Sequence, residues 1–256
     1  MVTAPRNLPT AVPSLPELAR NIETVRERIA AAALRAGRDA AGVTLIAVSK
    51  TVPVERLHGI ETTGATDLGE NRVQEAAAKI ETLGRVVSWH LIGRLQRNKA
   101  RAAVELFDLI HSVDDVELAL TLDRHASALG KRQRVLLQVN VSGEESKGGF
   151  DPAVLLVTAE RLAALPSLRP EGLMTIAPRD AGDAELRRVF GALRALHKRL
   201  APVFGAEHWR HLSMGMSDDY ETAVEEGATM ARVGRAIFGE RPLPPAQARA
   251  GQQREH

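Results

Sequence analysis

The amino-acid sequence predicts a single (β/α)₈ barrel of the TIM type, with an extra helix at its N-terminal end and no second domain. Strand-like and helix-like segments alternate along the chain until eight strands are counted, each separated from the next by a helix. The length of 256 residues suits such a barrel. No G-x-G-x-x-G turn follows the first strand, which leaves an open doubly wound sheet as the weaker alternative.

The extra helix and the first strand show different patterns of apolar residues. Apolar residues from Leu18 to Ile29 recur at helical spacing and Gly37 is a stop signal, so a helix is predicted over residues 15–36. Residues 43–50 form a run rich in Val, Ile and Thr between a glycine and a proline. That pattern is typical of a strand with both faces covered.

The remaining elements follow by the same two patterns. The predicted helices cover residues 54–63, 72–83, 96–104, 115–129, 152–164, 183–200 and 219–226. The predicted strands cover residues 65–69, 87–93, 106–111, 134–141, 169–174, 208–214 and 230–237. Proline-rich ends predict a loose leader over residues 1–13 and a flexible tail over residues 241–256, so the barrel is expected over residues 14–240.

Composition excludes several classes of function. Lys and Arg total 34 against 32 for Asp and Glu, and aromatic residues are only 3%, so a nucleic-acid surface is not expected. The absence of cysteine removes disulfides, thiolate catalysis and thiolate metal sites. Neither a secretory signal nor an apolar run of membrane-spanning length is evident, which predicts a cytoplasmic protein without membrane contact.

The reacting groups of a (β/α)₈ barrel lie at the carboxyl ends of its strands, and these ends are polar in this chain. Lys50 ends the first strand and supplies an amine. Glycine-containing turns around Gly215 and Gly234 expose backbone N–H groups that suit an anion such as phosphate. The strand-end segments are residues 49–50, 69–72, 90–93, 111–112, 140–142, 174–175, 213–217 and 232–235.

Pyridoxal phosphate is the cofactor that uses an amine, an anion site and a polar partner together. Its aldehyde condenses with a lysine amine, its phosphate is anchored, and its ring nitrogen takes a partner side chain. Lys50 is the candidate amine, and burial at a strand end would help it lose the proton that a lysine of pKa about 10.4 normally keeps. Arg232 is the candidate partner of the ring nitrogen, where a permanent cation keeps that nitrogen unprotonated.

Each of these residues also has a purely structural interpretation. Lys50 alone would be a solvated surface residue, and Arg232 alone would pair with Glu225 or Glu226, which are near in sequence. The glycines alone would be ordinary turn residues. For His90, a role in the cofactor pocket and a purely structural place in the core are equally good interpretations. The cofactor interpretation is preferred because these features occur together at strand ends.

Two further clusters of polar residues give weaker evidence of a functional site. The basic residues from Arg94 to Arg101 are interpreted as a solvated helix face rather than a nucleic-acid surface. His111, Asp114 and Asp115 resemble metal ligands, but no second clustered set completes a site, so no metal is expected. The two aspartates suit a helix N-terminus, where the helix dipole favours negative charge.

Eight motifs spread over nearly the whole chain resemble those of the pyridoxal phosphate homeostasis proteins, which resemble the barrel domain of alanine racemase standing alone. In chain order they are IAVSKT around Lys50, GENRVQEA at residues 69–76, WHLIGRLQRNK at 89–99, HSVD at 111–114, ESKGGF at 145–150, GLMTIAP at 172–178, LSMGMSDD at 212–219 and VGRAIFG at 233–239. Their length and order make the resemblance specific.

This resemblance implies a role for individual residues. Lys50 would carry pyridoxal phosphate as a Schiff base, and Arg232 would face the ring nitrogen. The other implied cofactor-binding residues are Asn71 and His90 in the ring pocket, Ser213 and the backbone of Gly234 and Arg235 at the phosphate, Met214 near the phosphate turn, and Met174 at the end of the sixth strand. Arg235 is a departure, because the family commonly has a small hydroxyl residue at that position. Its backbone N–H and guanidinium would remain as phosphate donors.

Two classes of function then compete. In the first, the protein binds and delivers pyridoxal phosphate in intracellular vitamin B6 homeostasis, as a monomer, without strong turnover, and with pyridoxal-phosphate-dependent apoenzymes as partners. In the second, it is an amino-acid racemase or related enzyme. Racemisation needs a second proton donor opposite Lys50, which alanine racemases bring from an additional β domain. This chain has only Tyr220, beside the predicted phosphate turn. The carrier is therefore preferred, and a metabolic barrel using Lys50 for another aldehyde or phosphate ligand is a third possibility.

Overall fold

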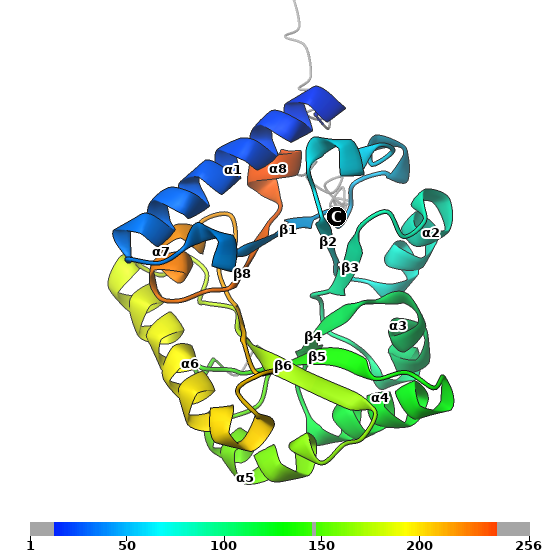
Figure 1. Ribbon diagram of the computed structural model, residues 1–256, viewed down its shortest axis with the longest axis vertical. Helices are drawn as coiled ribbons and strands as arrows, with labels where there is room; N and C mark the ends of the chain where they lie inside the picture. Colours follow the sequence, from blue (N-terminus) through cyan, green and yellow to red (C-terminus); the bar gives the residue numbers. More distant parts are fainter. Residues whose placement is uncertain (1–12, 145–146, 240–256) are drawn as a thin grey trace, which may run out of the picture.

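A closed ring of eight parallel strands, paired in the order β1 to β8, forms the centre of the computed structural model, which describes residues 13–144 and 147–239 (Figure 1). The strands are β1 (Thr44–Val48), β2 (Asp67–Glu70), β3 (Ser88–Leu91), β4 (Leu109–Val113), β5 (Gln133–Gln138), β6 (Leu168–Met174), β7 (His211–Ser213) and β8 (Met230–Val233). The predicted barrel is confirmed. The predicted leader and tail lie almost entirely outside the described residues.

The helices form an outer ring around the strands (Figure 1). They are α1 (Leu15–Arg35), α2 (Val73–Leu83), α3 (Ala100–Leu106), α4 (Val116–Ala128), α5 (Pro152–Ala163), α6 (Asp183–Phe204), α7 (Tyr220–Glu225) and α8 (Arg235–Phe238). Short 3₁₀ turns lie at Ala40–Gly42, Val54–Arg56, Ile60–Thr63 and Arg97–Lys99.

Helix α1 is the predicted extra helix, and it lies outside the barrel against α7 and α8 (Figure 1). Ser14 and Glu17 cap its N-terminus. The Glu17 carboxylate accepts hydrogen bonds from the Ser14 backbone N–H and hydroxyl at 2.8 and 2.6 Å. Its buried face consists of Leu18, Ile22, Val25, Ile29, Ala32 and Ala33. Contacts of this face with α7 and α8 hold the last two units of the barrel against the first.

Several elements have bounds that differ from the sequence prediction, and two of these differences have a glycine as their cause. Residues 54–63 form two 3₁₀ turns rather than one helix, because Gly59 at φ 80° and Gly64 at φ 84° interrupt the helical backbone. The last strand ends at Val233 and not at residue 237, because Gly234 begins the short helix α8. The second difference places Gly234 and Arg235 on a strand-to-helix turn.

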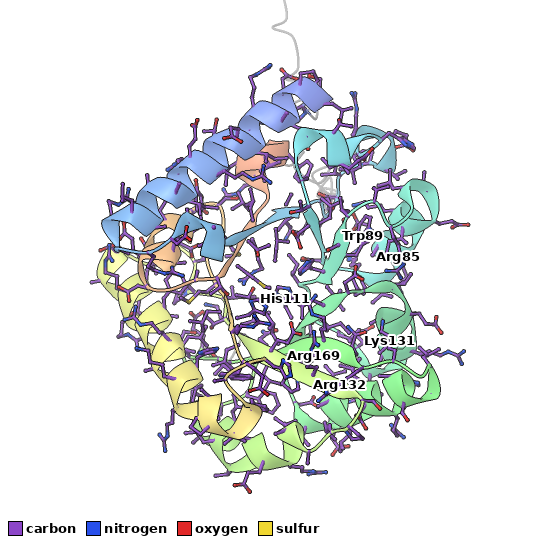
Figure 2. All side chains as sticks on the ribbon, in the orientation of Figure 1. Arg85, Trp89, His111, Lys131, Arg132 and Arg169 are labelled. Carbon is purple, nitrogen blue, oxygen red and sulfur yellow. The ribbon has the colours of Figure 1, made fainter. Side chains whose placement is uncertain are left out.

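The core has two layers. The larger layer lies between strands and helices and includes Leu68, Trp89 and Leu212. A smaller apolar cluster inside the barrel consists of Ile46, Leu109, Leu136, Met174 and Met230. Polar side chains also lie inside, and Figure 2 places the fully buried His111 within the ring of strands, whereas Trp89 faces the helices. The barrel interior is therefore partly a polar network.

His197 on α6 should make stability depend on pH. Its ring stacks on Trp209 with centroids 5.2 Å apart, and its buried Nε2 has no hydrogen-bond partner among the described residues. Burial, with a smaller contribution from His211, lowers the pKa of His197 from 6.5 to about 4. Below pH 6.5 His197 binds a proton in the unfolded chain but not in the folded protein. The free energy of unfolding therefore falls as pH falls from about 6.5 to about 4.

We expect His197 to account for about 2 kcal/mol of lost unfolding free energy between pH 7 and pH 5. Urea unfolding at both pH values measures this loss, and His197→Phe is the comparison because it keeps a planar ring without a titrating group. The variant should lose about 2 kcal/mol less than the wild type over this interval. Equal losses in the two proteins would contradict the prediction.

A candidate cofactor site at the carboxyl end of the barrel

Four consecutive strands, β7, β8, β1 and β2, bring most of the predicted cofactor residues toward one end of the barrel. Lys50 lies two residues after β1, and Asn71 follows β2 directly. Arg232 lies on β8 opposite Ile46 of β1, and Ser213 is the last residue of β7. The pairing of β1 with β8 closes the ring, so residues nearly 200 positions apart in the sequence become neighbours.

The residues on both sides of Lys50 are held by a buried charged cluster. The Lys79 ammonium donates to the Ser49 carbonyl oxygen at 2.7 Å, to Glu70 Oε1 at 2.7 Å and to Glu75 Oε1 at 2.8 Å. Glu75 Oε1 also accepts the Thr51 backbone N–H at 2.6 Å, and the Ser49 hydroxyl donates to Glu70 Oε1 at 2.6 Å. Ser49, Glu70 and Lys79 are buried, so this cluster fixes the backbone from which Lys50 projects.

The backbone beside Lys50 is unusual. Thr51 has φ 65°, a left-handed conformation that is unfavourable for a β-branched residue. Its N–H bond to Glu75 helps hold this turn. Burial raises the pKa of Glu70, although Lys79 and Ser49 oppose the increase. Half-buried Lys50 therefore directly precedes a strained residue whose backbone is held by hydrogen bonds.

Arg232 lies inside the barrel. Its side chain donates to the Ser213 hydroxyl at 2.6 Å and to the Thr175 carbonyl oxygen at 2.9 Å. Burial lowers its pKa to about 10, with Asp219 opposing the decrease, so it stays cationic at neutral pH. Neither Glu225 nor Glu226 binds it; these carboxylates instead meet Arg35, Arg187 and Arg194 on the outside of the barrel. The alternative ion-pair interpretation of Arg232 is therefore wrong.

The two glycine turns contact each other. The Gly234 N–H donates to the Ser217 hydroxyl at 3.3 Å, and the Arg232 N–H donates to the Gly215 carbonyl oxygen at 3.0 Å. Gly215 has φ 91°, and a Cβ there would lie 2.6 Å from Ala223 Cβ, so this position requires glycine. Ser217 therefore lies where the two turns meet, and the sequence prediction did not select it, although its hydroxyl two residues after Gly215 was the available signal.

Several predicted residues lie deeper or farther out than the site itself. The Ser213 hydroxyl is fully buried and faces His111 and Arg232. His90 is inside the barrel, bonded to Asp67 and His111.

The two methionines differ in position. Met174 belongs to the inner apolar cluster, and Met214 belongs to the layer between strands and helices. Both are fully buried. Their direct contact with a cofactor remains a prediction.

Asn71 and Arg235 lie nearer the surface. Asn71 is half-buried, and its backbone approaches Gly93 so closely that a Cβ at position 93 would lie 2.3 Å from the Asn71 carbonyl oxygen. The exposed Arg235 guanidinium forms an ion pair with Asp218. The Arg235 side chain therefore has a protein partner at the surface, and its backbone begins α8.

The described residues also limit other site types. Within residues 13–144 and 147–239, no group of three or more His, Cys, Asp or Glu side chains is arranged to hold a metal ion. Asp115 caps α4 by accepting the Leu118 N–H at 2.6 Å, as its sequence position predicted. None of the helices described is both long and apolar enough to span a membrane.

A hollow of about 540 Å³ lies at the opposite end of the barrel, between α1 and the first two strands. Its lining includes Thr44 and Asp67, which begin β1 and β2, together with α1 residues such as Glu23 and Arg26. This amino end lacks the lysine and the glycine turns. The carboxyl end is therefore the candidate cofactor site, and this hollow is not part of it.

Comparison with known proteins agrees with this architecture. The model of the alanine racemase N-terminal domain matches residues 14–242. Fold and site together define a barrel of the alanine racemase N-terminal type. The pyridoxal phosphate homeostasis protein of Aquifex aeolicus is 42% identical over 221 residues, covering 86% of this chain and 96% of that protein. The chain belongs to the family of pyridoxal phosphate homeostasis proteins.

Two further similarities support this assignment. The pyridoxal phosphate homeostasis protein of Pseudomonas aeruginosa is 44% identical over 225 residues, covering 88% of this chain and 96% of that protein. The structure of PipY from Synechococcus elongatus with pyridoxal phosphate bound is 40% identical, with a TM-score of 0.78, and covers 87% of this chain and 100% of its own.

Proposed function

We propose that this protein binds pyridoxal 5'-phosphate in intracellular vitamin B6 homeostasis, holding it as a Schiff base on Lys50 without strong catalytic turnover. The observation that carries the proposal is the meeting of β1 and β8. A Cβ at Gly234 would lie 3.3 Å from the Val48 carbonyl oxygen. The glycine turn therefore packs against Val48, which is two residues before Lys50. Arg232 precedes the same turn. The PipY structure, titled as having pyridoxal phosphate bound, supports the choice of cofactor.

The residues present fit this cofactor in their chemistry. Lys50 supplies the amine, and the Gly234 turn supplies backbone N–H groups for a phosphate. Arg232 has five N–H donors, of which two bond to Ser213 and to Thr175. A cation facing the ring nitrogen keeps that nitrogen unprotonated, and the bound ring is then a weak electron sink. This property suits a carrier better than an enzyme.

In this proposal the two serines have different roles. The Ser213 hydroxyl serves Arg232 inside the barrel. Ser217 and the backbone of Gly234 and Arg235 receive the phosphate, because Ser217 is half-buried and already bonded to Gly234. Asn71 is assigned to the rim of the ring pocket, at the end of β2.

The position of Tyr220 favours a carrier over a racemase. Its ring lies on the outer side of the barrel, 5.6 Å from the Arg28 guanidinium of α1, and it is 2% exposed. Burial raises the pKa of Tyr220. A racemase needs an acid on the face of the substrate opposite the lysine. A tyrosine between α7 and α1 does not fill that role.

Addition of pyridoxal phosphate to the purified protein tests the proposal. We expect a yellow complex that borohydride converts into a permanent adduct on the peptide containing Lys50. The unreduced complex should restore activity to a pyridoxal-phosphate-dependent apoenzyme, whereas chiral chromatography of incubated D- and L-amino acids should show no rapid interconversion. Failure to retain the cofactor would refute binding, and rapid Lys50-dependent racemisation would favour the enzyme.

We also propose that the protein acts in the cytoplasm as a monomer and that apoenzymes are its recipients. The absence of cysteine suits a reducing compartment. Size-exclusion chromatography with light scattering, before and after cofactor addition, is the test of the monomeric state. A dimer in both conditions would contradict this part of the proposal.

A further inference from the structure

A chain of hydrogen-bonded side chains, all buried except the half-buried Asp67, crosses the barrel interior beneath the candidate site. His90 Nε2 lies 2.9 Å from Asp67 Oδ1, and His90 Nδ1 lies 2.9 Å from His111 Nε2. His111 Nδ1 lies 2.9 Å from the Ser213 hydroxyl, to which Arg232 donates at 2.6 Å. The chain thus joins Asp67, at the amino end of the barrel, to Arg232 in the proposed cofactor site.

The donor and acceptor properties of these side chains determine the direction in which the hydrogen bonds of the chain run. Hydrogen bonds from His90 and Thr66 outweigh burial and lower the pKa of Asp67, so its carboxylate accepts the hydrogen on His90 Nε2. With its hydrogen on Nε2, His90 presents a lone pair on Nδ1 that can accept from His111 Nε2. Burial, reinforced by the positive charge of Arg232 and other cations, lowers the pKa of His111 well below its usual value.

The direction determines where the Ser213 hydrogen points. A neutral His111 protonated on Nε2 has a free lone pair on Nδ1, and the nearest donor to it is the Ser213 hydroxyl. The Ser213 oxygen is then turned toward Arg232, whose guanidinium can only donate. All four bonds therefore run one way, from Arg232 through Ser213, His111 and His90 to Asp67.

We propose that Asp67, His90 and His111 are positioning residues that orient the Ser213 hydroxyl and, through it, the Arg232 guanidinium toward the cofactor's ring nitrogen. This inference rests on the proposed function for the identity of the cofactor. It assigns to His90 a role beneath the cofactor's ring and not beside that ring. It also gives His111 a function that neither a metal site nor a helix N-terminus explains.

The arrangement has a physical advantage over a lone arginine. Every ring nitrogen of His90 and His111 has a partner, so neither imidazole can rotate without leaving a buried group unbonded. Arg232 is anchored at Ser213 and at the Thr175 carbonyl oxygen, which leaves its remaining donors in a fixed orientation. A preorganised donor set does not have to be ordered when the cofactor binds.

Nitrogen-edited NMR of the wild-type protein tests the direction of the chain without any cofactor. Long-range ¹H–¹⁵N correlations should show both His90 and His111 as neutral rings protonated on Nε2 at neutral pH. A hydrogen on His111 Nδ1, or a charged His90, would reverse the bond to Ser213 and overturn the proposal. Because no variant is involved, a failure to fold cannot obscure this result.

A double-mutant cycle tests whether the chain acts on the cofactor. We expect His111→Phe and Ser213→Ala each to weaken pyridoxal phosphate binding about tenfold and the double variant also about tenfold, because both break one path. The absorbance and fluorescence of the bound cofactor should shift alike in all three. His211→Phe is the matched control, since His211 also lies on the barrel strands but outside the chain. It should leave affinity and spectrum unchanged.

Two outcomes overturn the inference while leaving the proposed function intact. If the two single effects multiply to about a hundredfold, His111 does not act through Ser213. If His111→Phe changes thermal stability but neither affinity nor spectrum, its role is structural only. By contrast, a wild-type protein that retains no pyridoxal phosphate refutes the proposed function, and the NMR result then still reports on the chain itself.

Discussion

Replacing Lys50 with alanine should abolish the borohydride-stable adduct and the yellow colour of the complex. A Schiff base requires a primary amine, and the alanine side chain has none. Because Lys50 is half-buried at the end of β1, its truncation should change the free energy of unfolding by no more than about 1 kcal/mol. Mass spectrometry of the reduced protein and the absorbance spectrum after cofactor addition measure the two losses.

Lys147→Ala provides the matched control for this experiment. Lys147 follows β5 at the same end of the barrel and forms an ion pair with Glu144 at 2.6 Å. Its variant should keep both the colour and the adduct. A permanent adduct that persists in Lys50→Ala and disappears in Lys147→Ala would transfer the amine role to the other lysine.

Replacing Gly172 with alanine should prevent the barrel from closing. The Cβ of an alanine at this position would lie 1.9 Å from the His211 carbonyl oxygen and 2.6 Å from its carbonyl carbon. Gly172 pairs directly with His211, and β7 has only three residues, so few bonds resist the separation of β6 from β7. Its φ of 152° is also one that other residues rarely adopt.

We expect Gly172→Ala to lose at least about 4 kcal/mol of unfolding free energy or to be recovered only as insoluble protein. Urea unfolding monitored by circular dichroism measures the loss. Gly42→Ala is the matched control, because a Cβ there meets nothing within 4 Å and its φ is not positive. That variant should be neutral or slightly stabilising. A soluble Gly172→Ala protein of wild-type stability would contradict the close packing of β6 against β7.

Much of the barrel could be predicted because its signals are local. Apolar residues at helical spacing defined α1 and α6, and short apolar runs defined the strands. Two of the predictions failed where one glycine changes the backbone. Gly59 divides the expected helix over residues 54–63, and β8 ends at Val233, before Gly234, instead of at the expected residue 237. Sequence alone does not show whether such a glycine interrupts an element or lies within it.

The residues of the candidate site were proposed from the sequence, whereas their side-chain contacts came only from the fold. Polar residues at strand ends identified Lys50 and Arg232, because all parallel strands of a barrel end on the same face. The direction of a side chain depends on strand register, which short strands such as β7 specify weakly from sequence. The sequence therefore predicts a phosphate role for Ser213, whereas the roles that we propose for Ser217 and His111 come from contacts in the folded barrel.

Periodicity and strand-end chemistry in the linear chain were sufficient to predict the barrel and the lysine that we propose carries the cofactor, and the resemblance of eight motifs pointed to the family. The folded barrel was needed to show that Ser213 faces Arg232, that His90 and His111 lie beneath the site, and that Tyr220 lies outside it. The reason is physical. Local spacing sets which elements form, whereas the closure of β8 onto β1 sets which distant side chains share the buried interior.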